Sequence, residues 1–144
     1  MPIGTTHILI AELRSDLLVP SGPVHNGQAP EQAAQNVLLG APSGIPVHRR
    51  VAVDRVQMRR RQVFTYVVAA NPLTPADAAC LTYRDGRADL MVLPTAQATA
   101  ALPALARARI LAGLKALADQ EMAYLEAGIV SRTEPARLLG SSSP

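Results

Sequence analysis

The first half of the chain alternates short apolar runs with segments rich in proline and glycine. The run from Thr5 to Leu13 is apolar and rich in isoleucine, which predicts a first strand that extends as far as Val19. Residues 20–30 contain three prolines and two glycines and are expected to form a surface loop. A short helix is predicted for 31–39, with Pro30 in its first position, where a missing N–H costs nothing.

The middle of the chain predicts a long antiparallel hairpin. Apolar residues at period two share one face of an extended strand: Ile45, Val47, Val51 and Val53. The apolar positions change phase after Asp54-Arg55, which indicates a β-bulge there. Residues 62–70 form a second apolar run, so Arg59-Arg60-Arg61 is placed at the tip of the hairpin.

The second half predicts another hairpin and then mainly helix. Asp85-Gly86 is a strong turn signal between the runs 79–83 and 88–93. Leucines and alanines at i, i+3 and i+4 spacing predict one helix over 104–127, about 36 Å long, followed by Gly128 as its stop.

These elements together predict an α+β fold. We expect a mostly antiparallel sheet of four to five strands, with one long C-terminal helix packed on a face. Residues 95–102 are either a separate short helix or the near side of a kink at Pro103, and 133–135 open a further helical turn. Residues 1–144 are interpreted as a single domain with a loop-rich N-terminal part (1–44) and a frayed tail (141–144).

Composition then limits the class of protein. Hydrophobic residues make up 49% of the chain, which argues against general disorder. No apolar run reaches the roughly 18 residues of a membrane span, and the start lacks the features of a secretory signal. Cys80 is the only cysteine and lies in an apolar run, so we expect a buried thiol and a reducing compartment. The expected location is the cytoplasm, with no membrane contact.

Charge is sparse, which favours an assembled protein. Charged residues are 17% of the chain, against about 25% in an average soluble domain, and residues 1–45 hold only four of them. Either small polar residues face water instead, or other subunits cover the surface. Small residues on the second side of the predicted helix would permit close approach of a second subunit, so Ala108, Ala112 and Ala116 are the candidate subunit contacts.

The basic residues cluster in one segment. The chain carries a net charge of +3, but residues 46–62 hold six arginines against Asp54 alone, which is +5. Guanidinium groups bind phosphate bidentately, so this segment is a candidate contact for a DNA backbone or an acidic partner. Aromatic residues are only 3%, so base stacking is not expected. The candidate residues are Arg49, Arg50, Arg55, Arg59, Arg60 and Arg61, and the alternative is that they pair with carboxylates of neighbouring subunits or simply face solvent.

Catalytic patterns are lacking. The three histidines are far apart in sequence, and no phosphate loop, nucleophile elbow or dinucleotide motif occurs. Asp77 and Asp85 are accounted for by a helix start and a turn. We therefore predict no catalytic residue, no metal ligand and no cofactor, and a protein that is not an enzyme.

One short segment resembles a known family. Gly44-Ile45-Pro46-Val47-His48-Arg49-Arg50-Val51 resembles the opening strand of small β-rich domains in bacteriophage tail and neck proteins. The resemblance implies a structural virion component with no catalytic residues. The sequence thus predicts a non-enzymatic structural or assembly subunit of a larger homo-oligomeric complex. The alternative is a nucleic-acid-binding module that contacts the phosphate backbone through the arginine-rich hairpin.

Overall fold

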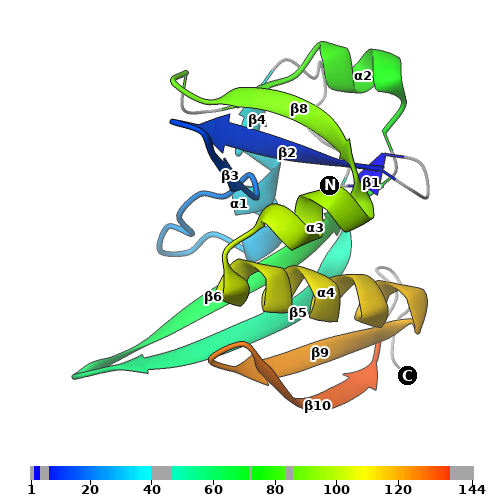
Figure 1. Cartoon of the computed structure of the whole chain (residues 1–144). Helices are drawn as coiled ribbons and strands as arrows, with labels where there is room; N and C mark the ends of the chain where they lie inside the picture. Colours follow the sequence, from blue (N-terminus) through cyan, green and yellow to red (C-terminus); the bar gives the residue numbers. More distant parts are fainter. Residues whose placement is uncertain (1, 4–6, 40–46, 72, 84–85, 137–144) are drawn as a thin grey trace.

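The fold is α+β, with its strands in separate sheets. The computed structural model describes residues 2–3, 7–39, 47–71, 73–83 and 86–136. Within these ranges it has two four-stranded sheets, a two-stranded ladder and four helices (Figure 1). In chain order the elements are β1 (Pro2–Ile3), β2 (His7–Leu13), β3 (Asp16–Leu18), α1 (Pro30–Gln35), β4 (Leu38–Leu39), β5 (Val47–Met58), β6 (Arg61–Ala70), α2 (Pro75–Ala79), β7 (Thr82–Tyr83), β8 (Asp89–Pro94), α3 (Thr95–Ala101), α4 (Ala104–Ala118), β9 (Glu121–Glu126) and β10 (Ile129–Pro135).

The first sheet is built around β2, which pairs with β8 on one side and with β1 and β3 on the other. Its residues are buried on both faces: Ile8 and Ile10 pack with Ala98 and Leu102, and Leu9 packs into a second apolar cluster. The predicted strand is therefore confirmed, but it stops at Leu13 instead of reaching Val19. Arg14-Ser15 turns the chain back with two positive φ angles, 51° and 69°, as a two-residue hairpin requires.

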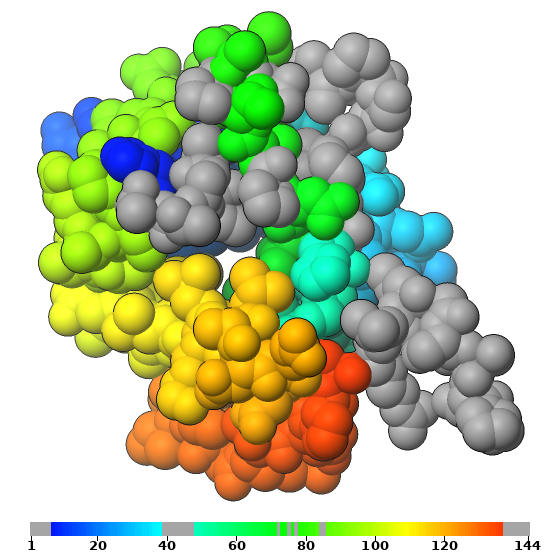
Figure 2. Space-filling model, turned by 90° about the vertical axis from the view of Figure 1, so that its right-hand side faces the viewer, coloured from blue at the N-terminus to red at the C-terminus, as the bar shows by residue number. Residues whose placement is uncertain are grey.

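The second sheet has the order β10-β9-β5-β6, and α4 lies across one of its faces (Figure 1). β5 and β9 run parallel, while the other neighbours are antiparallel. Small residues allow the close approach of helix and sheet. A Cβ at Gly113 would lie 3.1 Å from methyl groups of both Val51 and Val67. Figure 2 shows the surface of β9 and β10 directly beneath that of α4.

The predicted arrangement, one sheet with a single long C-terminal helix, is wrong. α4 ends at Ala118, and the rest of the predicted helix is the β9–β10 hairpin. Gln120 has a φ of +57°, which ends the helix, and Gly128 with a φ of +84° serves a strand turn. Ala123 and Leu125 are both buried at period two, so this stretch satisfies a strand as well as a helix. The helical turn expected at 133–135 is also strand.

Two details of strand pairing differ from the prediction. The runs 79–83 and 88–93 are not paired with each other in the described part of the chain, because β7 pairs with β4 and β8 pairs with β2. The bulge in β5 lies earlier than expected, between Arg50 and Ala52, with a further irregularity after Val47.

The tail at 141–144 and the start of the segment 44–51 lie outside the described residues. Among the described helices, none has the length and apolar character that crossing a membrane requires.

Candidate functional site

The predicted β5–β6 hairpin is confirmed, and its outer part stands away from the rest of the fold. The strands pair from Val47 with Ala70 to Met58 with Arg61, and Arg59-Arg60 forms the turn. The parallel pairing of β5 with β9 ends at Arg55. We call residues 56–63, which lie beyond that point, the arm. Figure 1 shows the arm extending past every other labelled element on that side.

Arg49, the first candidate arginine, is buried and belongs to the framework. Only 7% of the residue is exposed. Its Nη1 donates to the carbonyl oxygen of Glu121 at 2.7 Å, and its Nη2 donates to that of Ala116 at 3.1 Å. These carbonyls lie at the C-terminal end of α4 and the start of β9, where a helix leaves backbone acceptors without partners. Burial lowers the pKa of Arg49, but guanidinium stays charged at neutral pH. Arg49 therefore does not contribute to a surface for phosphate.

Two further arginines are paired within the chain. Arg50 donates to both carboxylate oxygens of Glu31 on α1, at 3.1 and 3.2 Å, and its guanidinium lies 4.9 Å from the ring centre of Tyr66. Arg55 donates to the carboxylate of Glu126 on β9. Both pairs are partly open to water. These contacts fasten β5 to its neighbours and reduce the charge that the hairpin offers to a partner.

The remaining three arginines gather at the end of the arm. Arg59, Arg60 and Arg61 are exposed, and none of their guanidinium groups contacts a carboxylate within the described ranges. The Gln57 side chain donates to the carbonyl oxygen of Arg61, which ties the two strands together next to the turn. The structure thus divides the six candidates into three that hold the fold and three that form one exposed positive tip.

A buried ion pair at the base of the hairpin was not predicted. The Asp54 carboxylate, which is 0% exposed, accepts from Arg109 Nε at 2.6 Å and from the backbone N–H of Gly128 at 3.2 Å. This pair joins β5 to α4 and to the β9–β10 turn. The available signal in the sequence was that Asp54 is the only acidic residue among the six arginines of 46–62.

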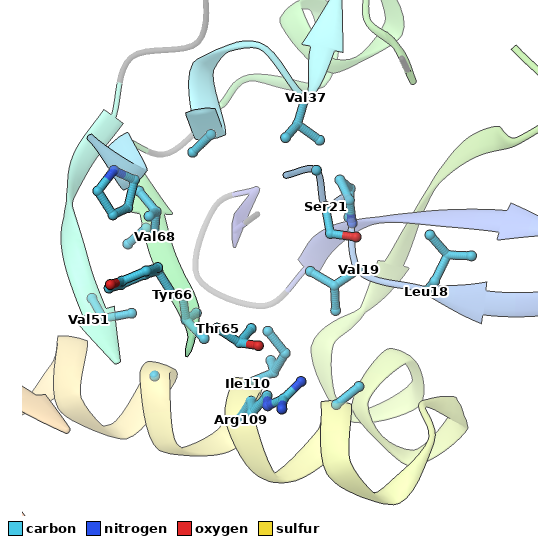
Figure 3. Close-up of a pocket in the computed structure, with 18 of the residues that line it drawn as sticks. Leu18, Val19, Ser21, Val37, Val51, Thr65, Tyr66, Val68, Arg109 and Ile110 are labelled. Carbon is cyan, nitrogen blue, oxygen red and sulfur yellow. The ribbon is translucent and has the colours of Figure 1, made fainter. Parts of the chain in front are cut away.

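A cavity of about 700 Å³ lies between the edge of β6, α4, α1 and the segment after β3 (Figure 3). Six consecutive residues of β6, from Phe64 to Ala69, line it, because no other described strand pairs with this edge. The opposite wall includes Leu18, Val19 and Val37. Arg109 is the one charged side chain among the described residues that line the cavity, whose walls are otherwise largely apolar.

The alanines predicted to contact another subunit face the chain's own sheet. Ala116 is 3% exposed and packs with Ala52, Ala123 and Leu125, and Ala112 packs against the same cluster. Ala108 lies beside Gly128, whose added Cβ would come within 3.5 Å of it. The small side chains permit close packing of α4 inside one molecule, so Ala112 and Ala116 leave little surface for a neighbour.

The remaining residues that could carry chemistry are dispersed. His7, His25 and His48 are exposed and lie in three different segments. No group of three or more histidine, cysteine, aspartate or glutamate residues in the described part of the chain is placed to hold a metal ion. Cys80, expected to be buried, is exposed just after α2.

Comparisons with protein-family models, with curated proteins and with solved structures found no match to this chain.

Proposed function

We propose that this chain is a non-enzymatic assembly subunit of a larger homo-oligomeric complex, a component of a bacteriophage virion, and that the arm contacts a neighbouring subunit. The observation that carries the proposal is the exposure of the arm. Residues 57–62 are all exposed, and Met58 at the end of β5 is 49% exposed. A two-stranded ribbon is only marginally stable in water by itself. A neighbour that covers the arm would bury these side chains and order it.

The β10 edge of the second sheet supports the same function. β10 is an outer strand with no further strand partner within the described residues, whereas the edge of β6 from Phe64 onward lines the cavity. Every residue of β10 is exposed, including Ile129 at 73%. Unpaired strand edges are templates for pairing with another chain. The β10 edge and the arm are two different surfaces of one molecule, which favours head-to-tail contacts that close into a ring or continue as a filament.

Sedimentation velocity tests the proposal at several micromolar concentrations. The wild-type chain is expected to sediment as an oligomer. A variant in which Asn-Gly replaces residues 56–63 keeps the base of the hairpin with a favourable two-residue turn and is expected to sediment as a monomer. The matched control is Arg59→Ser/Arg60→Ser/Arg61→Ser, which keeps the length of the arm and should remain oligomeric. A wild-type chain that is monomeric throughout the range would reject the proposal.

The positive tip favours a second candidate function, contact with a nucleic-acid backbone. A two-stranded ribbon fits the major groove of DNA, and three clustered guanidinium groups suit phosphate. Fluorescence anisotropy with a labelled DNA duplex would then show a salt dependence with a log–log slope of about −2.7, for three neutralised phosphates. The triple serine variant should lose this binding. Arg55→Ser is the control and should retain it, because the Arg55 guanidinium is already paired with Glu126. Equal affinity of the wild type and the triple variant would exclude this function.

A further inference from the structure

The cavity beside β6 is lined mainly by apolar residues, and its one charged side chain among the described residues, Arg109, lies where β6 meets α4. Its wall is aliphatic over most of its extent, with Val19 and Val37 on one side and Ile110 and Leu114 on the other. Its volume of about 700 Å³ falls in the range of small-molecule sites, roughly 300–1,000 Å³. At the end formed by β6 and α4, Thr65 and Arg109 are close together (Figure 3). An aliphatic wall with a local polar end suits an amphipathic ligand.

Arg109 is held in a fixed orientation through its Nε, and its Nη atoms remain available as donors. Its Nε is occupied by the fully buried Asp54, whose other oxygen is held by the N–H of Gly128. The guanidinium side chain is 19% exposed. Neither of its Nη atoms has a hydrogen-bond partner among the described residues, and the same holds for the Thr65 hydroxyl. No fully buried side-chain nitrogen or oxygen in the described part of the chain lacks a partner, so these donors are accessible from the cavity side or from solvent. Thr65 is the register partner of Asp54 across the hairpin. Both groups therefore lie next to the same buried carboxylate.

We propose that this cavity binds a small molecule with a carboxylate head and an aliphatic tail. The carboxylate accepts hydrogen bonds from the Nη atoms of Arg109 and from the Thr65 hydroxyl, and the tail lies along the aliphatic wall. Asp54 balances the charge of Arg109, so the preference for a carboxylate rests on the unused Nη donors: charge-assisted hydrogen bonds from them are stronger to a carboxylate than to a neutral oxygen, and the N–H of Gly128 shares the charge of Asp54. Asp54 acts as a positioning residue, because its bond to Nε fixes the guanidinium and leaves both Nη atoms available as donors. The site does not depend on the assembly function proposed above.

Displacement of a dansyl-labelled undecanoic acid, followed by fluorescence, tests the proposal, and the chain has no tryptophan to interfere. The competitors are dodecanoate and dodecan-1-ol, which share a tail and differ in the head. We expect dodecanoate to bind at least tenfold more tightly to the wild-type chain. In Arg109→Lys the ammonium can still pair with Asp54, but it has no second pair of planar donors to offer to a ligand carboxylate. We expect the preference to fall below threefold in that variant, with the affinity for the alcohol unchanged.

A second pair of variants tests the location of the tail. Ala34 on α1 lines the cavity, whereas its neighbour Gln35 is exposed and does not. Ala34→Trp should fill the cavity and abolish displacement by both competitors, while Gln35→Trp should leave both affinities unchanged. Circular dichroism melting verifies that each variant folds.

Three outcomes would overturn the proposal. The first is that the labelled probe does not bind to the wild-type chain, and the second is that the alcohol binds as tightly as the carboxylate. The third is that Ala34→Trp changes the sedimentation coefficient without changing probe binding, since the cavity would then be a contact between copies of the chain. Loss of oligomers in the arm-shortened variant leaves the ligand test intact, so the two proposals fail separately.

Discussion

The two ends of the β5–β6 hairpin use the same residue type in opposite ways. Near the body, Arg49 is buried among backbone carbonyls and Arg50 is clamped by a carboxylate and an aromatic ring. At the tip, Arg59, Arg60 and Arg61 face solvent with no carboxylate beside them in the described part of the chain. The strands are continuous between these ends, and both ends are rich in arginine.

The difference comes from what lies across from each residue. The inner half of β5 has β9 on its other side and α4 on one face, and α1 contacts it as well. Within the described ranges, each strand of the arm pairs only with the other strand of the hairpin. A guanidinium stabilises a fold where fixed acceptors surround it, and the same group remains available to a partner where they do not. Arginines that cluster in a sequence therefore need not act together, because the acceptors around each guanidinium decide its role.

The largest effect is expected at Asp54, where the hairpin joins the body. Asp54→Ala removes the carboxylate that neutralises Arg109 and caps the N–H of Gly128. Breaking a buried pair leaves an uncompensated charge and costs about 3–5 kcal/mol; we expect about 3 kcal/mol, because Arg109 is still partly hydrated. Urea unfolding followed by far-ultraviolet circular dichroism measures the loss.

A double-mutant cycle isolates the pair itself. Asp54→Ala/Arg109→Met should be less destabilised than the sum of the two single variants, because neither partner is then left alone. Additive losses would show that the two side chains stabilise the fold independently. The Asp54–Arg109 pair would then not be the main electrostatic contact of the inner half of the hairpin.

Arg49→Met should give the second-largest loss. Methionine has a similar length, but the carbonyl oxygens of Ala116 and Glu121 lose their donors. Buried acceptors left without a partner cost about 1–3 kcal/mol, so we expect about 2 kcal/mol in the free energy of unfolding. The same urea measurement applies, with Arg61→Met as the exposed control. Equal losses in the two variants would contradict the division of the hairpin.

The sequence was informative where one pattern has one physical solution. The isoleucine-rich run ending at Leu13 is a strand, as its β-branched residues favour, and two apolar runs separated by Arg59-Arg60-Arg61 form a hairpin. The positive tip followed from the count of arginines. The burial of Arg49 could not be predicted in this way, because it depends on backbone acceptors at Ala116 and Glu121, which are far from it in the sequence.

The helix boundary and the cavity could not be read in this way. Residues 118–126 fit a helical stripe through Met122 and Leu125, and they fit a strand through Ala123 and Leu125. Parallel pairing with β5 decides between them, and that contact is long-range. The cavity likewise forms between segments that are distant in sequence, and nothing in the sequence around Arg109 indicates that it lies beside Asp54.

Arg50→Gln should have a moderate effect, because its pair with Glu31 is partly open to water. Bidentate geometry and the Tyr66 ring raise its contribution above that of an ordinary surface pair, and we expect a loss of about 1 kcal/mol. Arg55→Gln is the matched control, since its pair with Glu126 is more exposed and should contribute about 0.5 kcal/mol or less. Reversal of this order would mean that solvent exposure does not govern the ion pairs along β5.

The smallest effect on stability is expected at the tip. Arg59→Ser/Arg60→Ser/Arg61→Ser removes three exposed guanidinium groups and leaves the backbone pairing and the Gln57 bond to the carbonyl of residue 61 in place. Surface substitutions of this kind change the free energy of unfolding by about 0.5 kcal/mol or less. Arg59 has a φ of +33°, so Arg59→Gly should stabilise the turn by a few tenths of a kcal/mol. Urea unfolding at a concentration where the chain is monomeric is the required measurement. A loss of more than about 1 kcal/mol in the triple variant would place the tip in contact with the body, and the contrast between the two ends of the hairpin would not hold.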